Sequence, residues 1–150
     1  MTRILAMVGA AVLLVFSLGS VGCETLSEMG GESSGAFGTW KLTALGDNEV
    51  APMLPEGMEA PSITISPDGT VSGSTGVNQM SASLDLAELA QGTFKMNPAA
   101  VTKMAGPAKA MALETKFIAS LQEATGIDVS NNRLRLSRDD MKLATFQREK

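Results

Sequence analysis

The sequence predicts an α+β fold in which one amphipathic helix packs against a curled or barrel-like antiparallel β-sheet. Two observations predict it. From residue 38 onward, short runs with alternating apolar residues follow one another, separated by glycine, proline and asparagine turn signals. One stretch, 107–125, instead has apolar residues at spacings of three and four. Many short strands with a single helix favour a meander whose helix covers an opening or a face of the sheet.

The first predicted strand is "GTWKLTAL", residues 38–45, which places Trp40 and Leu42 on the same face. The next stretch, 46–61, contains three prolines and several acidic residues and is expected to be a long surface loop. Ile63 and Ile65 then alternate with polar residues. They precede a Pro-Asp-Gly turn at 67–69, which predicts a β-hairpin with Val71 on the returning strand. Further strands are expected at 81–86, 93–96, 127–130, 133–137 and 141–146.

The predicted helix begins at Gly106 and Pro107, because proline suits the first turn of a helix. Gly126 is expected to end it as a left-handed cap. Its apolar stripe comprises Ala110, Leu113, Phe117, Leu121 and Ala124.

After the helix, turns are expected at Asn131 and Asn132 and at 138–140, where Asp139 and Asp140 read as turn formers. In the last strand Leu143 and Phe146 have opposite parity. A β-bulge or the end of the strand would account for that parity.

Composition limits the function. The chain has 150 residues, 44% of them hydrophobic, which suits one domain with its own core. Its formal net charge of −4 predicts a surface that repels both nucleic acid and anionic lipid headgroups. It contains no His and no Tyr, so the commonest general base and the commonest metal ligand are missing. We therefore expect no cofactor, no metal and no catalytic residue.

The amino-terminal segment 1–22 predicts an export signal. Arg3 precedes an apolar run over 4–18, and small residues follow before Cys23, the one cysteine of the chain. A retained transmembrane helix is the alternative, but it needs about 20 apolar residues.

The small residues followed by Cys23 resemble a bacterial lipoprotein signal. The resemblance implies that the Cys23 thiol carries a diacylglyceryl group and that palmitate-like acyl chains hold the protein on a membrane. Ser20 departs from the pattern, which usually has Leu there, and ordinary signal peptidase could cut at the same bond. Residues 23–37 are expected to be a flexible tether. Glu24 is compatible with an outer membrane facing the periplasm, if the cell has two membranes.

The glycines at 69, 73 and 76 do not predict a phosphate-binding loop. No Lys lies between Gly69 and Gly76, and a strand rather than a helix is expected next. Bulges and close backbone approach explain glycines in strands better.

Three blocks in order, "GTVSGSTGVNQMSASLDL", "VTKMAG" and "MALETKFIASLQ", resemble the META domain family and its HslJ-like members. The resemblance implies a META-like domain over 38–149. The family-motif positions are Trp40, Gly73, Gly76, Asn78, Thr102 and Glu114.

Two departures from the family pattern matter. Family members usually have cysteine where this chain has Val77 and Gly106, so the resemblance implies that any bridge there is lost. Packing is expected to replace it, with Val77 as a buried substitute. Lys103 stands where Arg is common, which weakens any case for carboxylate binding there.

Two motif residues allow more than one interpretation. Asn78 is expected to tie down the backbone of an irregular strand, although it could orient a ligand. Glu114 is expected to form an ion pair on the helix surface, with Lys103 or a neighbour across the sheet, although it could act as a general base.

These observations predict a non-enzymatic exported envelope lipoprotein, held at the membrane through Cys23, with a stress or envelope-support role implied by the resemblance. An alternative is a module binding a hydrophobic ligand or an envelope lipoprotein, through a pocket lined by the helix and by Ile63, Ile65 and Leu84. A second alternative is a hydrolase, which would need Glu114 and Asp85 in one cleft.

Overall fold

The computed structural model describes residues 35–150. The expected signal segment, Cys23 and the tether up to residue 34 lie outside the described residues. The strands are β1 (Gly38–Leu45), β2 (Asn48–Glu49), β3 (Ser62–Ile65), β4 (Thr70–Ser74), β5 (Gln79–Ser83), β6 (Ala100–Val101), β7 (Gly126–Ser130), β8 (Arg133–Arg138) and β9 (Met141–Arg148). The helices are η1 (Ala51–Met53), α2 (Leu86–Leu89) and α3 (Ala108–Glu123).

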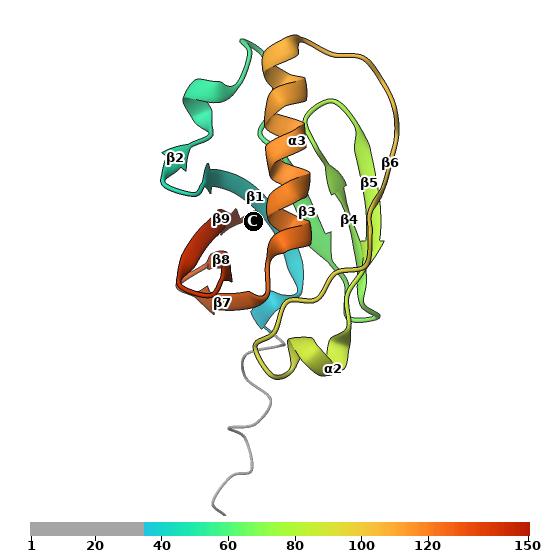
Figure 1. Cartoon of the computed structure of the whole chain (residues 1–150), viewed down its shortest axis with the longest axis vertical. Helices are drawn as coiled ribbons and strands as arrows, with labels where there is room; N and C mark the ends of the chain where they lie inside the picture. Colours follow the sequence, from blue (N-terminus) through green and yellow to red (C-terminus); the bar gives the residue numbers. More distant parts are fainter. Residues whose placement is uncertain (1–34) are drawn as a thin grey trace, which may run out of the picture.

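The strands form one antiparallel sheet, which confirms the predicted α+β class. Its order is β6-β5-β4-β3-β1-β9-β8-β7, and β2 pairs with β1. The long helix α3 lies across this sheet, and the short helix α2 lies near one end of it (Figure 1). The first and last long strands, β1 and β9, pair with each other in the middle of the sheet, so hydrogen bonds join the two ends of the domain.

The sheet is curled but not closed, and residues 92–97 connect its two halves. Met96 forms an isolated bridge with Leu84, and Thr93 forms one with Gly126. The strand predicted at 93–96 is therefore wrong, because its two ends pair with different parts of the sheet and no ladder develops. Phe94 between them is buried in the core.

The core lies between α3 and the concave side of the sheet. All five residues of the predicted helix stripe are at most 5% exposed, which confirms it. Phe117 packs edge-on against Phe146, with ring centroids 6.2 Å apart. Each such buried aromatic side chain contributes about 2 to 3 kcal/mol of hydrophobic stabilisation.

The end of α3 differs from the prediction. Pro107 precedes the first turn as expected, but the residue after the helix, Ala124, is extended and buried. Gly126 does not act as a left-handed cap and instead begins β7, paired with Ser137. A Cβ at Gly126 would lie 2.8 Å from Ser137 Oγ, so glycine permits close approach of the two strands there.

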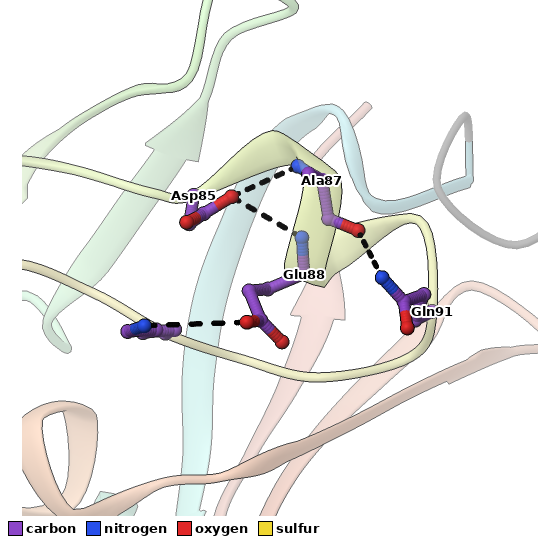
Figure 2. A network of polar contacts seen from close by, with 5 residues as sticks. Asp85, Ala87, Glu88 and Gln91 are labelled. Carbon is purple, nitrogen blue, oxygen red and sulfur yellow. Dashed lines mark hydrogen bonds and ion pairs between the residues drawn. The ribbon is translucent and has the colours of Figure 1, made fainter.

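The strand predicted at 81–86 ends early because a helix begins. Asp85 caps α2, its Oδ1 accepting hydrogen bonds from the backbone N–H groups of Ala87 at 3.0 Å and Glu88 at 3.2 Å (Figure 2). Gln91 Nε2 donates to the Ala87 carbonyl at 3.1 Å and fastens the far end of the turn (Figure 2). Leu86, expected inside, is therefore 37% exposed.

The hairpins before and after the helix follow the sequence prediction. Ile65 pairs with Val71 across the first turn, where the Thr70 N–H donates to Asp68 Oδ1 at 2.8 Å and lowers the pKa of that carboxyl. Asn131 and Asn132 have φ of 51° and 58°, as a two-residue hairpin turn requires.

Of the two explanations for the parity of the last strand, the structure shows the bulge. In the pairing of β8 with β9, Leu136 lies opposite Ala144 while Ser137 lies opposite Lys142. Leu143 is thus the extra residue, and Phe146 returns to the buried face.

Candidate functional site

The turn between β4 and β5, residues 75–78, begins a polar cluster that contains three of the family-motif positions, two of which, Asn78 and Glu114, are buried. The Thr75 N–H donates to the Asn78 carbonyl at 2.8 Å and closes the turn. Gly76 has φ +95°, a conformation that side chains rarely adopt. On β4, a Cβ at Gly73 would lie 2.1 Å from the Ser62 carbonyl oxygen. The glycines therefore shape the hairpin, as expected.

Asn78 is the centre of this cluster. Its Oδ1 accepts from the Met104 N–H at 2.7 Å and from the Thr102 hydroxyl at 3.0 Å. Its Nδ2 donates to the Met104 carbonyl at 3.3 Å and to both carboxylate oxygens of Glu114, at 2.9 and 3.1 Å. The prediction that the Asn78 side chain ties down backbone is confirmed in part, because the backbone that it holds is the segment before α3 and not an irregular strand.

Glu114 does not form the expected surface ion pair with Lys103. Its side chain points inward from α3, where the residue is 8% exposed and also accepts a hydrogen bond from the Thr75 hydroxyl. Position 114 adjoins the stripe residue Leu113, and that side of α3 faces the β4–β5 turn. Among the described residues, every buried side-chain nitrogen or oxygen has a hydrogen-bond partner. The cluster is therefore a saturated lock between hairpin and helix.

Thr102 extends the lock to the sheet edge. Its hydroxyl accepts from the Gln79 N–H at 3.0 Å while donating to Asn78, and its own N–H donates to the Gln79 carbonyl at 3.0 Å. This places the segment around β6 alongside β5. Asn78, Thr102 and Glu114, which are 36 residues apart at most, are thus one structural unit.

Trp40, the remaining motif position, belongs to a separate cluster. Its Nε1 donates to the Ala36 carbonyl at 2.7 Å, and the Arg148 guanidinium lies 4.2 Å from its ring centroid. Arg148 also donates to the carbonyls of Gly35 and Phe37, so this clamp fixes the point at which the chain enters the domain.

The two positions where family members usually carry cysteine are in contact. A Cβ at Gly106 would lie 2.8 Å from both γ-carbons of Val77 and 3.4 Å from its Cβ. Val77 was expected to be buried but is half-buried, because the β4–β5 turn lies at the rim of the domain.

The geometry needed by the hydrolase alternative is not present. Asn78, which holds Glu114, precedes β5, whereas Asp85 follows it. The extended strand between them separates the two by about 20 Å. The pocket expected at Ile63, Ile65 and Leu84 is also not present, because these residues are at most 6% exposed and belong to the filled core.

The structure instead has an open groove that the sequence did not predict. It lies where the 46–61 segment, which contains β2 and η1, runs beside β1 and the end of β9, and its volume is about 660 Å³. Its lining comprises Lys41, Leu42, Thr43, Ala44, Glu49, Ala51, Leu54, Met58, Glu59, Ala60, Gln147, Arg148 and Glu149. The fold of the loop over β1 creates this groove, and no local motif marks it.

Residues 35–150 contain no group of three or more metal-ligating His, Cys, Asp or Glu side chains. No helix within that range is long and apolar enough to cross a membrane.

The family is decided by a match between the META domain model and residues 36–150. The chain belongs to the META domain family. The motif positions of this META domain are hence those of the hairpin, the polar lock and the entry clamp described above.

Solved structures resemble this META domain in fold. One is an NMR structure of a protein from Burkholderia xenovorans, with a TM-score of 0.59, 21% identity, and coverage of 78% of this chain and 86% of that one. Another is a crystal structure of a DUF4847 family protein from Bacteroides vulgatus, with a TM-score of 0.50, 21% identity and coverage of 77% and 94%. No curated protein matches the sequence.

Proposed function

We propose that this META domain protein is a non-enzymatic binding module of the bacterial envelope, exported and held at a membrane through Cys23, whose groove beside β1 receives an apolar group of a ligand or partner. The groove is the observation that carries the proposal. The family resemblance adds the expectation of a stress or envelope-support role.

The groove suits an apolar ligand in size and lining. Its volume of about 660 Å³ lies within the range of 300 to 1,000 Å³ that small-molecule sites occupy. Ala44, Leu54, Met58 and Ala60 supply apolar surface. The charged residues of its lining have both signs, but Arg148 is engaged in the entry clamp, which leaves Lys41 and three glutamates to orient a polar head.

The polar residues of the lock support a binding role more than a catalytic one. The side chains of Asn78, Thr102 and Glu114 form hydrogen bonds with one another and with the backbone, so these groups are already occupied. A catalytic acid or base must reach a substrate atom. The groove offers contact surface without such a constellation.

A bulky side chain in the groove tests the binding proposal. Ala51→Trp, in η1, is expected to weaken binding of a fluorescent long-chain fatty acid at least tenfold, because the indole occupies space that the ligand needs. The matched control is Ala108→Trp, at another exposed alanine, which does not line the groove. Fluorescence titration gives both dissociation constants. Equal affinity in the two variants, or no binding by the unaltered protein, would refute the apolar-ligand role.

A second experiment tests the anchor separately. The protein purified from the membrane fraction of its own cells is expected to have the mass of a chain beginning at Cys23 plus acyl groups. Cys23→Ser is expected to lose both the added mass and the membrane retention. An unmodified chain in the soluble exported fraction would mean that ordinary signal peptidase cuts before Cys23, which would contradict the anchor but leave the groove untouched.

A further inference from the structure

The surface around α3 is basic although the chain as a whole is acidic. From residue 97 to the end of α3 at residue 123 the charged residues are Lys103, Lys109, Lys116, Glu114 and Glu123. Glu123 is paired with Arg138 at 2.8 Å. Glu114 is buried in the polar lock, whereas the three lysines are exposed. The exposed charge of this stretch is thus positive in a chain whose formal net charge is −4.

These lysines differ in their pairing from four other surface cations, whereas the exposed Arg133 and Lys150 share their lack of an ion pair within residues 35–150. Lys95, Arg135, Arg138 and Lys142 each have a carboxylate within 4.0 Å. Within residues 35–150, no ion pair includes any of the three lysines near α3. The adjoining loop carries Glu56 and Glu59, and neither pairs with them. Their charge is therefore available to a partner.

Apolar surface accompanies the charge. Lys109 and Lys116 line a hollow of about 240 Å³ between α3 and η1, together with Pro52, Met53, Ala112 and Leu113. Met104, beside Lys103 in the chain, is 57% exposed. We name Lys103, Met104, Lys109 and Lys116, with this hollow, the lysine face.

We propose that the lysine face docks on the anionic surface of a membrane, the ammonium groups binding phospholipid phosphates while Met104 and the hollow contact the apolar part of the interface. Phosphate oxygens accept hydrogen bonds from ammonium groups, and exposed apolar side chains favour the acyl boundary. An acidic protein approaches such a surface most favourably through a basic face.

The proposal rests on anchoring, because three lysines alone bind weakly. Each lysine near an anionic surface raises partitioning by about fivefold, so three give only about 100-fold. Cys23 lies 12 residues before the first described residue, Gly35, and such a chain reaches at most about 40 Å. An anchor at that distance raises the effective concentration of the lysine face at the membrane. The weak attraction of the lysines is then sufficient to orient the domain.

A chemical anchor makes the test independent of native lipidation. The chain from Cys23 to Lys150, which contains the entire described core, is coupled through its one thiol to maleimide lipid in vesicles. One vesicle set is phosphatidylcholine alone, and the other contains about one third phosphatidylglycerol. Brief acetylation followed by mass spectrometry measures the reactivity of each lysine.

On the anionic vesicles, acetylation of Lys103, Lys109 and Lys116 is expected to fall about fivefold relative to the neutral ones, and Lys95 and Lys142 are expected to stay unchanged. About 1 M salt should abolish the difference by screening. The double change Lys109→Gln with Lys116→Gln should remove the protection of Lys103, whereas the matched pair Lys95→Gln with Lys142→Gln should leave it.

Three outcomes would overturn the proposal. Equal acetylation on both vesicle sets would show that the face does not dock. Equal protection on neutral vesicles would show contact without charge recognition. Protection by soluble inorganic phosphate in the absence of vesicles would show that the lysines bind free phosphate instead of a membrane.

Discussion

Replacing Asn78 by Ala is expected to lower the free energy of unfolding by about 3 to 5 kcal/mol. The change removes the amide that donates to Glu114 and the oxygen that accepts from Thr102 and the Met104 N–H. Asn78 is 1% exposed, so water cannot replace these partners without opening the domain. Urea unfolding, followed by the fluorescence of the one tryptophan, Trp40, measures the loss.

Asn97 provides the matched control. It is an exposed asparagine whose Nδ2 donates to Ser83 Oγ at 2.8 Å, so Asn97→Ala removes an amide of the same kind where water can replace it. The expected loss is below about 1 kcal/mol. If both variants lost the same stability, the polar lock would not hold the helix to the hairpin.

A double-mutant cycle separates this lock from general packing. The double variant Asn78→Ala with Glu114→Ala is expected to lose less unfolding free energy than the two single variants lose in sum. The expected difference is about 1 to 3 kcal/mol. Each single change leaves the other polar group buried without its partner, while the double change removes both groups. Additive losses would indicate that the two side chains act independently.

The lock also shows why sequence reasoning found the motif residues but misjudged Glu114. The stripe from Ala110 to Ala124 and the hairpin turns are local patterns, and a helical or alternating period identifies them directly. Glu114 meets Thr75 across 39 residues, and that contact depends on how α3 lies over the β4–β5 turn. A carboxylate at the edge of an apolar stripe occupies the same helical position whether it forms an ion pair on the surface or a buried hydrogen bond. The spacing of residues therefore cannot tell the two apart.

Two other errors have local competitors as their cause. Leu84 and Leu86 alternate as in a strand, but Asp85 between them is a strong N-cap and starts a helix. Gly126 follows a helix as a cap would, but the same absence of a Cβ also allows β7 to approach Ser137. In both cases one residue is compatible with two structures. At Asp85 the helix N-cap prevails over the strand, and at Gly126 the pairing of β7 with β8 prevails over the helix cap.

The groove was beyond local reasoning for a different reason. Residues 46–61 carry the composition of a surface loop, and they are one, yet Val50 within them is 1% exposed. That buried residue holds the loop against the sheet, and the Leu42 N–H donates to the Pro61 carbonyl at 2.8 Å. The apolar residues on either side of these attachments are left lining a groove. Its existence depends on long-range packing.

The separation of roles within the domain follows from these contacts. The family-motif residues build the hairpin, the lock and the entry clamp, which are structural tasks. The groove and the lysine face are formed largely by residues outside that motif set. Proteins of this family can therefore share the fold while differing in what their surfaces bind.

Introducing the cysteine pair that this chain lacks is expected to stabilise the domain strongly. In Val77→Cys with Gly106→Cys, the new Cβ at 106 lies 3.4 Å from that at 77, close to the mean of about 3.8 Å for disulfides. The bridge would close a loop of about 30 residues, which corresponds to about 3 to 4 kcal/mol. Thermal unfolding of the oxidised protein should therefore shift upward by about 10 to 15 °C relative to its reduced form.

The controls for this bridge use the same contact. All variants carry Cys23→Ser, so that the engineered thiols have no competitor. Gly106→Ala alone should lower stability, because its methyl group would meet the Val77 γ-carbons at 2.8 Å, and adding Val77→Ala should restore most of the loss. A disulfide that forms without raising the unfolding temperature would mean that it strains the segment before α3. The stabilisation expected here, with the rescue by Val77→Ala, would show that a valine packed against a glycine occupies the place of the bridge.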